Sequence, residues 1–376
     1  MIKGHLIIGL DIGSANCKAL AVAKNPDGLE IVGQAVVENS GVRKGVVISA
    51  SQVSQKIKEA LADCLNGIKS KGKVGTLAAN INGSHLSFIP SRGLAQVSRA
   101  DQKISEADVE RVLQASRTIS ISANQEVLDV YPQEFIIDGQ PGVREILGLR
   151  GIRLEAKTLC LAVFSPYLKN LSEAILAADL ETETILPSVL ASGSAVLTEK
   201  EKELGCVLLD LGAGTTGLAV FEEGILQHAA VLPLGSNNIT NDIAVVLRIE
   251  VEEAERKKRY LASKTALKIL AKVVEARNRE IFSEVAKELK KINKPKLHGG
   301  VILTGGGAKL FGLVDFAKKE LKLPARIGQP MGLTTEIEDP ALAAAAGLVL
   351  EAAKNLETVE AGPLSRLKNI FKPFVP

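Results

Sequence analysis

The chain has 376 residues, more than one hydrophobic core usually supports, so the length predicts two or more domains. Hydrophobic residues make up 46% of the chain, which excludes a largely disordered protein. A net charge of +3 and an aromatic content of 3% argue against a nucleic-acid-binding surface, and we expect no nucleic acid among the partners.

The first part of the chain alternates between strands and helices. Short apolar runs predict buried strands at 6–10, 19–23, 31–37 and 76–81, and apolar residues at helical spacing predict a helix at 49–65. The segment 84–160 differs, because strands with alternating polar and apolar residues surround one short helix. That helix begins with a capping-box pattern at Ser105 and Asp108. We interpret the segment as a small α+β insertion.

The second part repeats the alternation, which indicates an α/β fold. Its expected elements are helices at 168–180 and 188–199, a strand at 206–212, a broken helical region at 239–264, a helix at 273–291, a strand at 299–307 that runs into a glycine turn, and helices at 309–321 and 341–355. The charged run 255–260 is interpreted as a solvated helix end.

One motif occurs twice, about half a chain apart. LIIGLDIGSANCKALAV (6–22) and CVLLDLGAGTTGLAV (206–220) both consist of a strand, Asp-x-Gly, small polar residues and a second strand. Such a repeat suggests duplicated domains around a shared cleft. Glycines let backbone N–H groups approach a polyphosphate, hydroxyls and Lys18 add donors, and the aspartates Asp11 and Asp210 suit Mg²⁺ held through water. The other residues of this set are Gly13, Ser14, Gly212, Gly214, Thr215 and Thr216.

Two further glycine turns precede predicted helices. In TGGGAKL (304–310), Gly305, Gly306 and Gly307 come before a helix whose first N–H groups suit an anion or a nucleoside. In LPLGSNNITNDIA (232–244), Gly235 and Asn237 stand in the same position. Taken alone, the first could be a plain strand–helix turn and the second a loop with an N-cap.

These four elements, in this order, resemble the superfamily of actin, heat-shock chaperones and sugar kinases. VLPLGSNNITNDIAVVL, EVLDVYPQEFIIDGQPGVREILGLRGIRLE and VILTGGGAKLFGLVDFAKKEL are similar to the FtsA family of bacterial cell-division proteins, and the similarity extends from about 7 to 350. The resemblance implies an actin-like (ribonuclease H-like) two-domain α/β fold with a nucleotide cleft and a small insertion in the first domain. It implies ATP, with Mg²⁺, bound between the two domains.

The resemblance also implies partners and a location. Family members polymerise like actin, bind the C-terminal peptide of the tubulin-like protein FtsZ, attach the FtsZ ring to the cytoplasmic face of the cell membrane at the division site, and recruit later division proteins. Residue by residue, it assigns the first phosphate hairpin to Asp11, Gly13, Ser14 and Lys18, the second to Asp210, Gly212, Gly214, Thr215 and Thr216, a nucleotide-side loop to Gly235 and Asn237, and the adenosine loop to Gly305, Gly306 and Gly307.

The domain organisation follows from the same resemblance. We expect a first actin-like subdomain at 1–83 and 161–187, the inserted subdomain at 84–160, a second actin-like subdomain at 188–239 and 299–352, a smaller subdomain at 240–298, a linker at 353–362 and a membrane-targeting helix at 363–376.

Related actin-like proteins position water with a carboxylate or Gln near the helix that follows Pro187. Here the residues are Leu186, Pro187 and Ser188, so no catalytic residue is assigned. Loss of a general base costs a factor of about 10²–10⁴ in rate. We therefore expect ATP binding with at most slow ATPase activity.

The end of the chain, GPLSRLKNIFKPFVP (362–376), has apolar residues at helical spacing and several cations. This pattern is typical of a basic amphipathic membrane anchor, and the alternative is a terminal helix that docks back on the domain. The residues expected to contact lipid are Leu364, Arg366, Leu367, Lys368, Ile370, Phe371, Lys372 and Phe374.

Two other functions stay open at this point. One is a small-molecule kinase of the same superfamily, which would need a catalytic aspartate that the sequence does not clearly offer. The other is an actin-like scaffold of type IV pilus assembly, which shares the insertion and the nucleotide motifs. The strings YPQEFIIDGQPG and ITNDIA, together with the tail, favour the division family.

Overall fold

The structure is a computed structural model that describes residues 5–67, 75–142, 146–182, 184–260, 268–292 and 297–360. Two five-stranded sheets form its centre, with strand orders β10-β6-β1-β2-β3 and β13-β12-β11-β14-β15. The first sheet consists of β1 (His5–Ile12), β2 (Asn16–Asn25), β3 (Gly28–Glu38), β6 (Thr76–Ile81) and β10 (Thr184–Pro187). The second consists of β11 (Cys206–Leu211), β12 (Thr216–Glu222), β13 (Ile225–Leu232), β14 (Gly300–Thr304) and β15 (Ala325–Ile327).

The two sheets have the same topology. In each, three consecutive strands form an antiparallel meander, and two later strands add in parallel to the side of the first strand. The Asp-x-Gly motif joins the first and second strands of each meander. The duplication predicted from the sequence repeat is therefore present in the fold.

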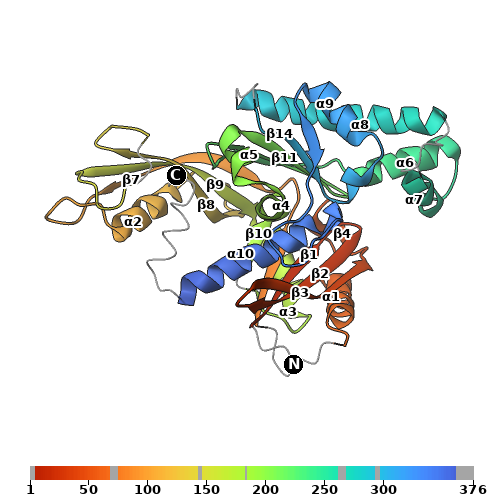
Figure 1. Ribbon diagram of the computed structural model, residues 1–376, viewed down its shortest axis with the longest axis horizontal. Coiled ribbons are helices and arrows are strands. Elements are labelled where there is room, and N and C mark those ends of the chain that lie inside the picture. Colours follow the sequence, from red (N-terminus) through yellow and green to blue (C-terminus); the bar gives the residue numbers. More distant parts are fainter. Residues whose placement is uncertain are drawn as a thin grey trace.

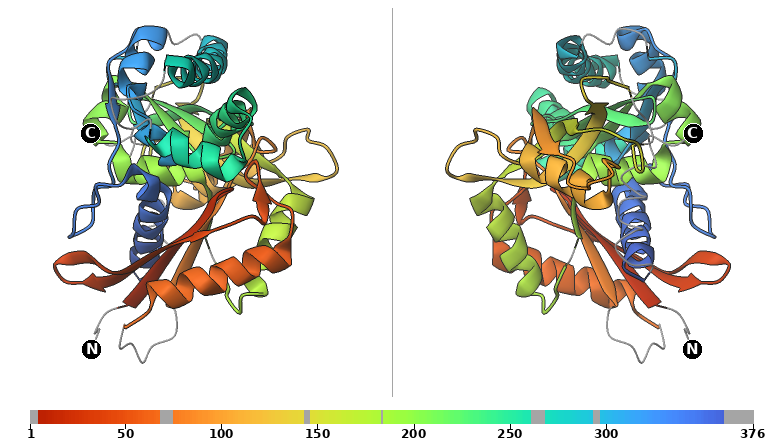
Figure 2. Two further views of the ribbon diagram at one scale, coloured as in Figure 1. Left: turned by 90° about the vertical axis from the view of Figure 1, so that its right-hand side faces the viewer. Right: turned by 90° about the vertical axis from the view of Figure 1, so that its left-hand side faces the viewer.

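Two helices lie between the sheets and share one core with both. They are α4 (Ser188–Val196) and α10 (Ala343–Glu360), and Figure 2 shows α10, in dark blue, alongside the strands of the first half. Small residues allow the close approach: a Cβ placed on Gly347 would lie 1.6 Å from the Ala191 carbonyl oxygen, and one on Gly9 would lie 2.3 Å from the Ala345 carbonyl oxygen. The halves are thus joined through tightly packed helices.

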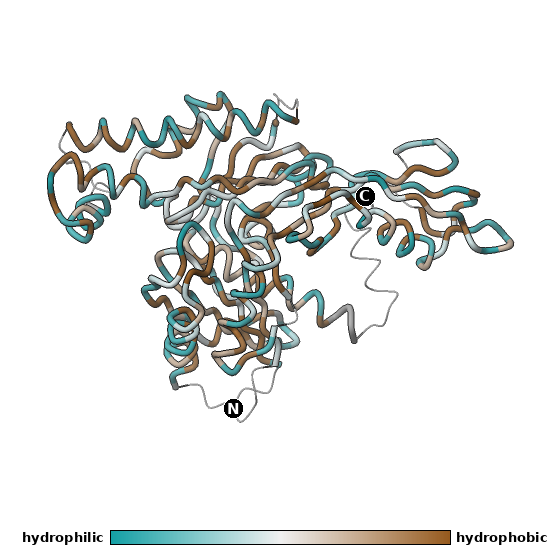
Figure 3. The backbone as a smooth tube through the Cα atoms, turned by 180° about the vertical axis from the view of Figure 1, so that it is seen from behind, coloured by the Kyte–Doolittle hydropathy of each residue, from teal (hydrophilic) through white to brown (hydrophobic). Residues whose placement is uncertain are grey.

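The outer faces of the sheets are covered by other helices. α1 (Ala50–Cys64) and α3 (Ser165–Leu176) pack on the first sheet, while α8 (Lys268–Lys291) and α9 (Leu313–Leu321) pack on the second. α6 (Ser236–Leu247) and α7 (Val251–Tyr260) join the start of α8 in a small cluster of their own. In Figure 3 the hydrophobic stretches lie mainly in the central strands. No helix in the described ranges is long and apolar enough to cross a membrane.

The insertion is a separate layer of α2 (Glu106–Ser116) on a three-stranded sheet, ordered β7-β9-β8. Its strands are β7 (Ser87–Gln96), β8 (Gln125–Ile137) and β9 (Arg153–Phe164), and it projects from the junction of the two halves (Figure 1). The expected capping box is present, since the buried Asp108 accepts hydrogen bonds from both the N–H and the hydroxyl of Ser105.

Several helices begin or end at other residues than the sequence suggests. The region 239–264 is broken, as predicted, where Arg248 adopts φ 55°. The helix expected at 309–321 begins only at Leu313, because Gly312 with φ 73° separates it from a short 3₁₀ turn, η1 (Gly306–Lys309). The helix expected at 188–199 ends at Val196, and Thr198 caps a separate helix, α5 (Glu199–Leu204).

The linker expected at 353–362 is helical as far as Glu360. Ala353 is buried and Leu356 packs against the core shared by the two halves, so burial stabilises this part of α10 as a helix. The eight lipid-contacting residues predicted in the tail lie outside the described residues. The remaining short elements are β4 (Val42–Arg43), β5 (Val46–Val47) and η2 (Pro340–Leu342). The subdomain boundaries given above stay predictions.

Candidate functional site

The first hairpin joins β1 to β2 and is held by hydrogen bonds from several segments. The Gly13 N–H donates to the Asn16 carbonyl at 2.9 Å, and the Asn39 amide donates to the Gly13 carbonyl at 2.8 Å. The Gly45 N–H donates to Ser14 Oγ, also at 2.9 Å. These bonds fix the shape of the turn within the protein itself.

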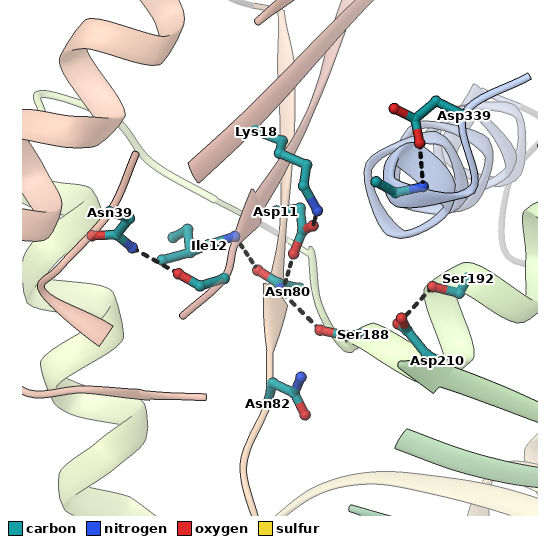
Figure 4. A network of polar contacts seen from close by, with 12 residues as sticks. Asp11, Ile12, Lys18, Asn39, Asn80, Asn82, Ser188, Ser192, Asp210 and Asp339 are labelled. Atoms are coloured by element: carbon teal, nitrogen blue, oxygen red, sulfur yellow. Dashed lines mark hydrogen bonds and ion pairs between the residues drawn. The ribbon is translucent and has the colours of Figure 1, made fainter. Parts of the chain in front are cut away.

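Asp11 lies next to this turn in a buried network of polar side chains (Figure 4). Lys18 is its cross-strand neighbour, and Lys18 Nζ lies 2.8 Å from Asp11 Oδ2. Asn80 Nδ2 donates at 2.7 Å to both Asp11 Oδ1 and Ser188 Oγ. Asn80 Oδ1 in turn accepts the Ile12 N–H at 2.7 Å. Asn80 therefore fixes the orientation of the Asp11 carboxylate.

The second hairpin joins β11 to β12 with the same backbone geometry. The Gly212 N–H donates to the Thr215 carbonyl at 2.9 Å, as Gly13 does to Asn16 in the first hairpin. Asp210 Oδ2 accepts a hydrogen bond from Ser192 Oγ at 2.9 Å. Ser192 lies one turn after Ser188 on α4, so one face of this helix contacts Asp210 directly and Asp11 through Asn80.

The tips of the two hairpins meet. A Cβ placed on Gly214 would lie 2.7 Å from Ser14 Oγ and 3.0 Å from Lys44 Cα. Asn82, which follows β6 in the first half, donates from Nδ2 to Thr215 Oγ1 at 3.1 Å. Around this meeting point the halves enclose a cleft of about 1140 Å³. A volume of this size accommodates a nucleotide.

The triple-glycine turn forms another wall of the cleft. Gly305 adopts φ 83°, and a Cβ there would lie 2.5 Å from Asp210 Oδ1, so only glycine fits. Lys309 Nζ pairs with Asp339 Oδ2 at 2.6 Å, and Asp339 also caps η2 by accepting the Ala341 N–H. Gly305 precedes a single 3₁₀ turn that contains Gly306 and Gly307, so the expected site at the N-terminus of an α-helix is not formed there.

The start of α6 packs directly on the second hairpin. The N–H groups of Ser236 and Asn237 donate to the carbonyls of Gly212 and Ala213, at 2.9 and 2.8 Å. These two N–H groups are therefore engaged by the protein. The Gly235 N–H donates to Asn238 Oδ1, which closes the first turn of the helix.

Residues of α7 form a further wall of the cleft. Lys258 is buried, and its Nζ lies 2.6 Å from Glu255 Oε2 and 2.8 Å from Thr240 Oγ1. Burial lowers the pKa of Lys258 from its ordinary value, although Glu255 opposes this shift. The interpretation of 255–260 as a solvated helix end is therefore wrong for Lys258, which faces the cleft.

The charges next to the hairpins perturb one another. Burial and the nearby Asp11 charge raise the pKa of Asp210 to about 6. Burial opposes the charged form of Lys18, but Asp11, and then Asp210 and Asp339, outweigh it and raise its pKa. One cation thus lies among several carboxylates, an arrangement that favours a further cation.

The structure brings most of the sequence-predicted residues to this one cleft. Those that line it are Asp11, Gly13, Ser14, Lys18, Asp210, Gly212, Gly214, Thr215, Asn237, Gly305, Gly306 and Gly307. Two do not. The Thr216 hydroxyl is buried and donates to the Leu234 carbonyl at 2.8 Å. Gly235 packs beneath the second hairpin, where a Cβ would lie 2.5 Å from the Ala213 carbonyl oxygen.

Sequence reasoning missed several polar residues of the site. Asn80 and Asn82 stand at the carboxyl end of β6, and that end of a parallel strand is where α/β proteins place ligand contacts. The two asparagines in NIN were therefore a usable signal. Ser192, Lys258, Lys309 and Asp339 gave none, because their roles depend on contacts distant in the sequence.

Comparison with known proteins identifies the family. A family model described as cell division protein FtsA matches residues 207–347, and one described as an SHS2 domain inserted in FtsA matches residues 83–162. The cell division protein FtsA of Pseudomonas aeruginosa is 35% identical, over 93% of this chain and 89% of that protein. The chain belongs to the FtsA family. FtsA of Bacillus subtilis is 31% identical, over 94% of this chain and 85% of that protein.

Solved structures show that this member of the FtsA family has the actin-like fold predicted from the sequence. The chain is similar to a type IV pilus biogenesis complex, PilM–PilN, with a TM-score of 0.71 and 19% identity, over 94% of this chain and 99% of that one. It is also similar to MreB5 of Spiroplasma citri bound to AMPPNP, with a TM-score of 0.56 and 14% identity, over 95% of this chain and 99% of that one. At these identities the likeness concerns the fold alone. The relatives at 30% identity and above confirm the sequence-based preference for the FtsA family over a pilus scaffold.

Proposed function

We propose that this chain binds ATP in the cleft between its two halves. The observation that supports this most strongly is the contact between the two hairpin tips, Gly13–Ser14 and Gly214–Thr215, at one cavity. Two facing turns that carry hydroxyl groups suit the oxygens of a triphosphate, and Lys18 adds a positive charge. A protein of the same fold is known in complex with AMPPNP.

Mg²⁺ would be held by Asp11 and Asp210 through water. Their carboxylates lie close enough for Asp11 to raise the pKa of Asp210, and a divalent cation would neutralise this repulsion. Within the described ranges, no cluster of three or more acidic, His or Cys side chains could ligate a metal directly. When bound, the ion would neutralise charge on the phosphates.

The nucleoside would lie between the remaining walls of the cleft. We assign Gly305–Gly307 to one side of it and Asn237 to the other, with Lys258 and Glu255 closing the far end. The buried Lys258 and the half-buried Glu255 form a hydrogen-bonded pair that offers both a donor and an acceptor at this position.

Turnover would be slow. Ser188, at the start of α4, accepts a hydrogen bond from Asn80, and a neutral hydroxyl is a weak base. The nucleotide would then act mainly as a ligand that favours one arrangement of the two halves.

In the cell, the chain would polymerise like actin on the cytoplasmic face of the membrane and attach the FtsZ ring to it at the division site. Membership of the FtsA family supports this proposal. The smaller subdomain at 240–298 would receive the C-terminal peptide of FtsZ, and the 363–376 tail would bind lipid. Later division proteins would join the assembled filament.

The decisive experiment is a titration of the pure, full-length chain with a fluorescent ATP analogue in the presence of Mg²⁺. We expect saturable binding that unlabelled ATP displaces, together with less than a few turnovers per minute. Failure to bind, or transfer of phosphate to members of a sugar panel, would contradict the proposal. Binding of a pilus-assembly peptide in place of the FtsZ peptide would instead favour the pilus alternative.

A further inference from the structure

The insertion contacts the second half of the molecule through two irregular strands. β8 is an edge strand of the insertion, and its register with β9 shifts between Pro132 and Glu134, which leaves Gln133 as an extra residue. β13 is an edge strand of the second sheet, and its register with β12 shifts in the same way at Gln227. β-Bulges redirect side chains and free backbone groups from the strand ladder.

These two bulges face each other. Gln133 Nε2 donates to the carbonyl of Leu226 at 2.9 Å and to that of Gln227 at 3.0 Å. One side-chain amide therefore satisfies two backbone acceptors on an edge strand that would otherwise expose them. The sequence separation is more than 90 residues, so the contact depends on how the two halves are arranged.

Apolar contacts accompany the hydrogen bonds. Ile225, at the start of β13, packs against the core of the insertion. Leu159 of β9 belongs to the same buried cluster as Leu226 and Ala229 of β13. This cluster also contains α4 and α10, the helices between the two sheets.

The position of the contact gives it a mechanical role. The halves are joined by the α4–α10 pair at the core and by the hairpin tips at the cleft. Gln133 adds a further connection between the halves, and it leads into the insertion. Rotation of one half against the other would stretch or compress this contact, because both bulges belong to strands of hydrogen-bonded sheets.

We propose that the insertion is a brace that sets the angle between the two halves, with the Gln133 amide as its fastening point. Occupancy of the cleft and the position of the insertion are then coupled. Such coupling is reciprocal. A partner that binds the insertion and shifts its position changes the affinity for nucleotide, and nucleotide changes the affinity of the insertion for that partner. The link to nucleotide rests on the function proposed above, whereas the brace itself does not.

The sharpest variant is Gln133→Glu. It keeps the shape of the side chain but replaces the NH₂ group, which donates both hydrogen bonds, with a carboxylate oxygen that faces the two carbonyl oxygens. Gln114→Glu, on the exposed surface of α2 in the same insertion, is the matched control. Gln133→Ala provides a second variant that removes the donors without adding charge.

Spin labels measure the distance between the insertion and the second half of the molecule, and this measurement needs no nucleotide. The four native cysteines are buried, so labels can be placed at new cysteines that replace the exposed Glu110 on α2 and Lys319 on α9. Distances between them, measured by double electron–electron resonance, should form one narrow distribution in the parent chain and in Gln114→Glu. The distribution should broaden or shift in both Gln133 variants. Unchanged distributions in these variants would overturn the brace.

Nucleotide titration then tests the coupling. We expect Gln133→Glu to change the Kd for Mg²⁺-ATP by about threefold to tenfold, the effect of losing a net hydrogen bond, while Gln114→Glu leaves it unchanged. Altered distances with an unchanged Kd would overturn the coupling and leave the brace supported. If the parent chain does not bind ATP, the proposed function fails, and the distances alone decide the brace.

Discussion

At the scale of single residues, Asp210 combines a cost to the fold with a proposed role in binding. The pKa of an aspartate in an unfolded chain is about 3.9. Burial and Asp11 raise the pKa of Asp210 to about 6 in the folded protein, so ionisation is harder there. The carboxylate therefore lowers stability as the pH rises from about 4 through about 6. Such a charge is useful where a cation binds.

Asp210→Asn separates these two effects. Removing the charge should leave the thermal midpoint at pH 7.5 equal to or above that of the parent chain, because no buried carboxylate must ionise. Affinity for Mg²⁺-ATP should fall by about 10- to 100-fold, which is the usual effect of losing a group that holds a metal ion indirectly, here through water. Scanning calorimetry and nucleotide titration give the two values, and Asp315→Asn on the exposed face of α9 is the control. Equal affinity in both variants would contradict the assignment.

The pKa of Asp108 is shifted in the opposite direction to that of Asp210. This buried carboxylate accepts hydrogen bonds from the backbone and hydroxyl groups of Ser98 and Ser105. Burial opposes ionisation, but the bonds from Ser105 and Ser98 outweigh it and lower the pKa of Asp108. Its contribution to stability is thus present above the unfolded pKa of about 3.9 and is lost as the pH falls below that value.

We expect Asp108→Asn to destabilise the insertion at pH 7 by about 1–3 kcal/mol, because at least one buried donor loses its partner. The difference from the parent chain should shrink as the pH falls below about 4, because the carboxylate of the unfolded chain is then protonated while that of the folded protein still resists protonation. Amide hydrogen exchange of α2 measures both effects. A difference that stays constant with pH would contradict the role given to ionised Asp108.

The residues of the site were predictable where a short motif contains them. Asp11, Lys18 and Asp210 come from the two Asp-x-Gly repeats, and the antiparallel pairing of β1 with β2 places Lys18 opposite Asp11. Asn80 and Ser192 were not predicted, because they reach the aspartates from other elements. Thr216 was expected at the cleft, but strand alternation turns its side chain toward the Leu234 carbonyl.

At the scale of elements, the contact between α4 and α10 determines how the halves join. Glycine inside a helix usually costs about 0.5–1 kcal/mol relative to alanine. At Gly347 this rule reverses, because a Cβ would lie 1.6 Å from the Ala191 carbonyl oxygen. At Gly193 on α4 the nearest contact of a Cβ would be an ordinary 3.4 Å.

Gly347→Ala should therefore destabilise the protein by at least about 1–3 kcal/mol, the cost of overpacking a core. Gly193→Ala should stabilise it, by up to about 1 kcal/mol. Thermal midpoints of the two variants measure the contrast. If both variants shifted the thermal midpoint in the same direction, the result would contradict the close approach of α4 and α10 at Gly347.

Most elements were predictable because their apolar patterns are regular. The strand of each motif, the insertion and the break near Arg248 all agree with the structure. The end of α10 was not predictable, since 353–360 looks like a polar connection and Leu356 becomes helical through contacts with a distant core. The helix after the triple glycine was placed too early, because Gly312 interrupts it.

At the scale of the whole molecule, two copies of one sheet topology face each other across a cleft, and an insertion connects them on another side. The duplicated motif predicted this architecture, whereas the path of the insertion to β13 depends on two bulges that no local pattern reveals. The tail would attach this assembly to a membrane.

The tail should bind membrane weakly in the monomer and firmly in a filament. Each cation near an anionic surface adds about 1 kcal/mol, and many tails on one polymer act together. Pelleting with anionic liposomes should therefore be strong for the full chain with Mg²⁺-ATP and much weaker for a 1–361 truncation. Equal pelleting of the two would contradict the anchor.

The central claim is that both hairpins contact the same triphosphate. A crystal structure of the chain with Mg²⁺ and a non-hydrolysable ATP analogue tests it directly. The account predicts phosphates between Gly13–Ser14 and Gly214–Thr215, with the cation beside Asp11 and Asp210. An analogue bound elsewhere, or one contacted by only one of the two hairpins, would contradict it.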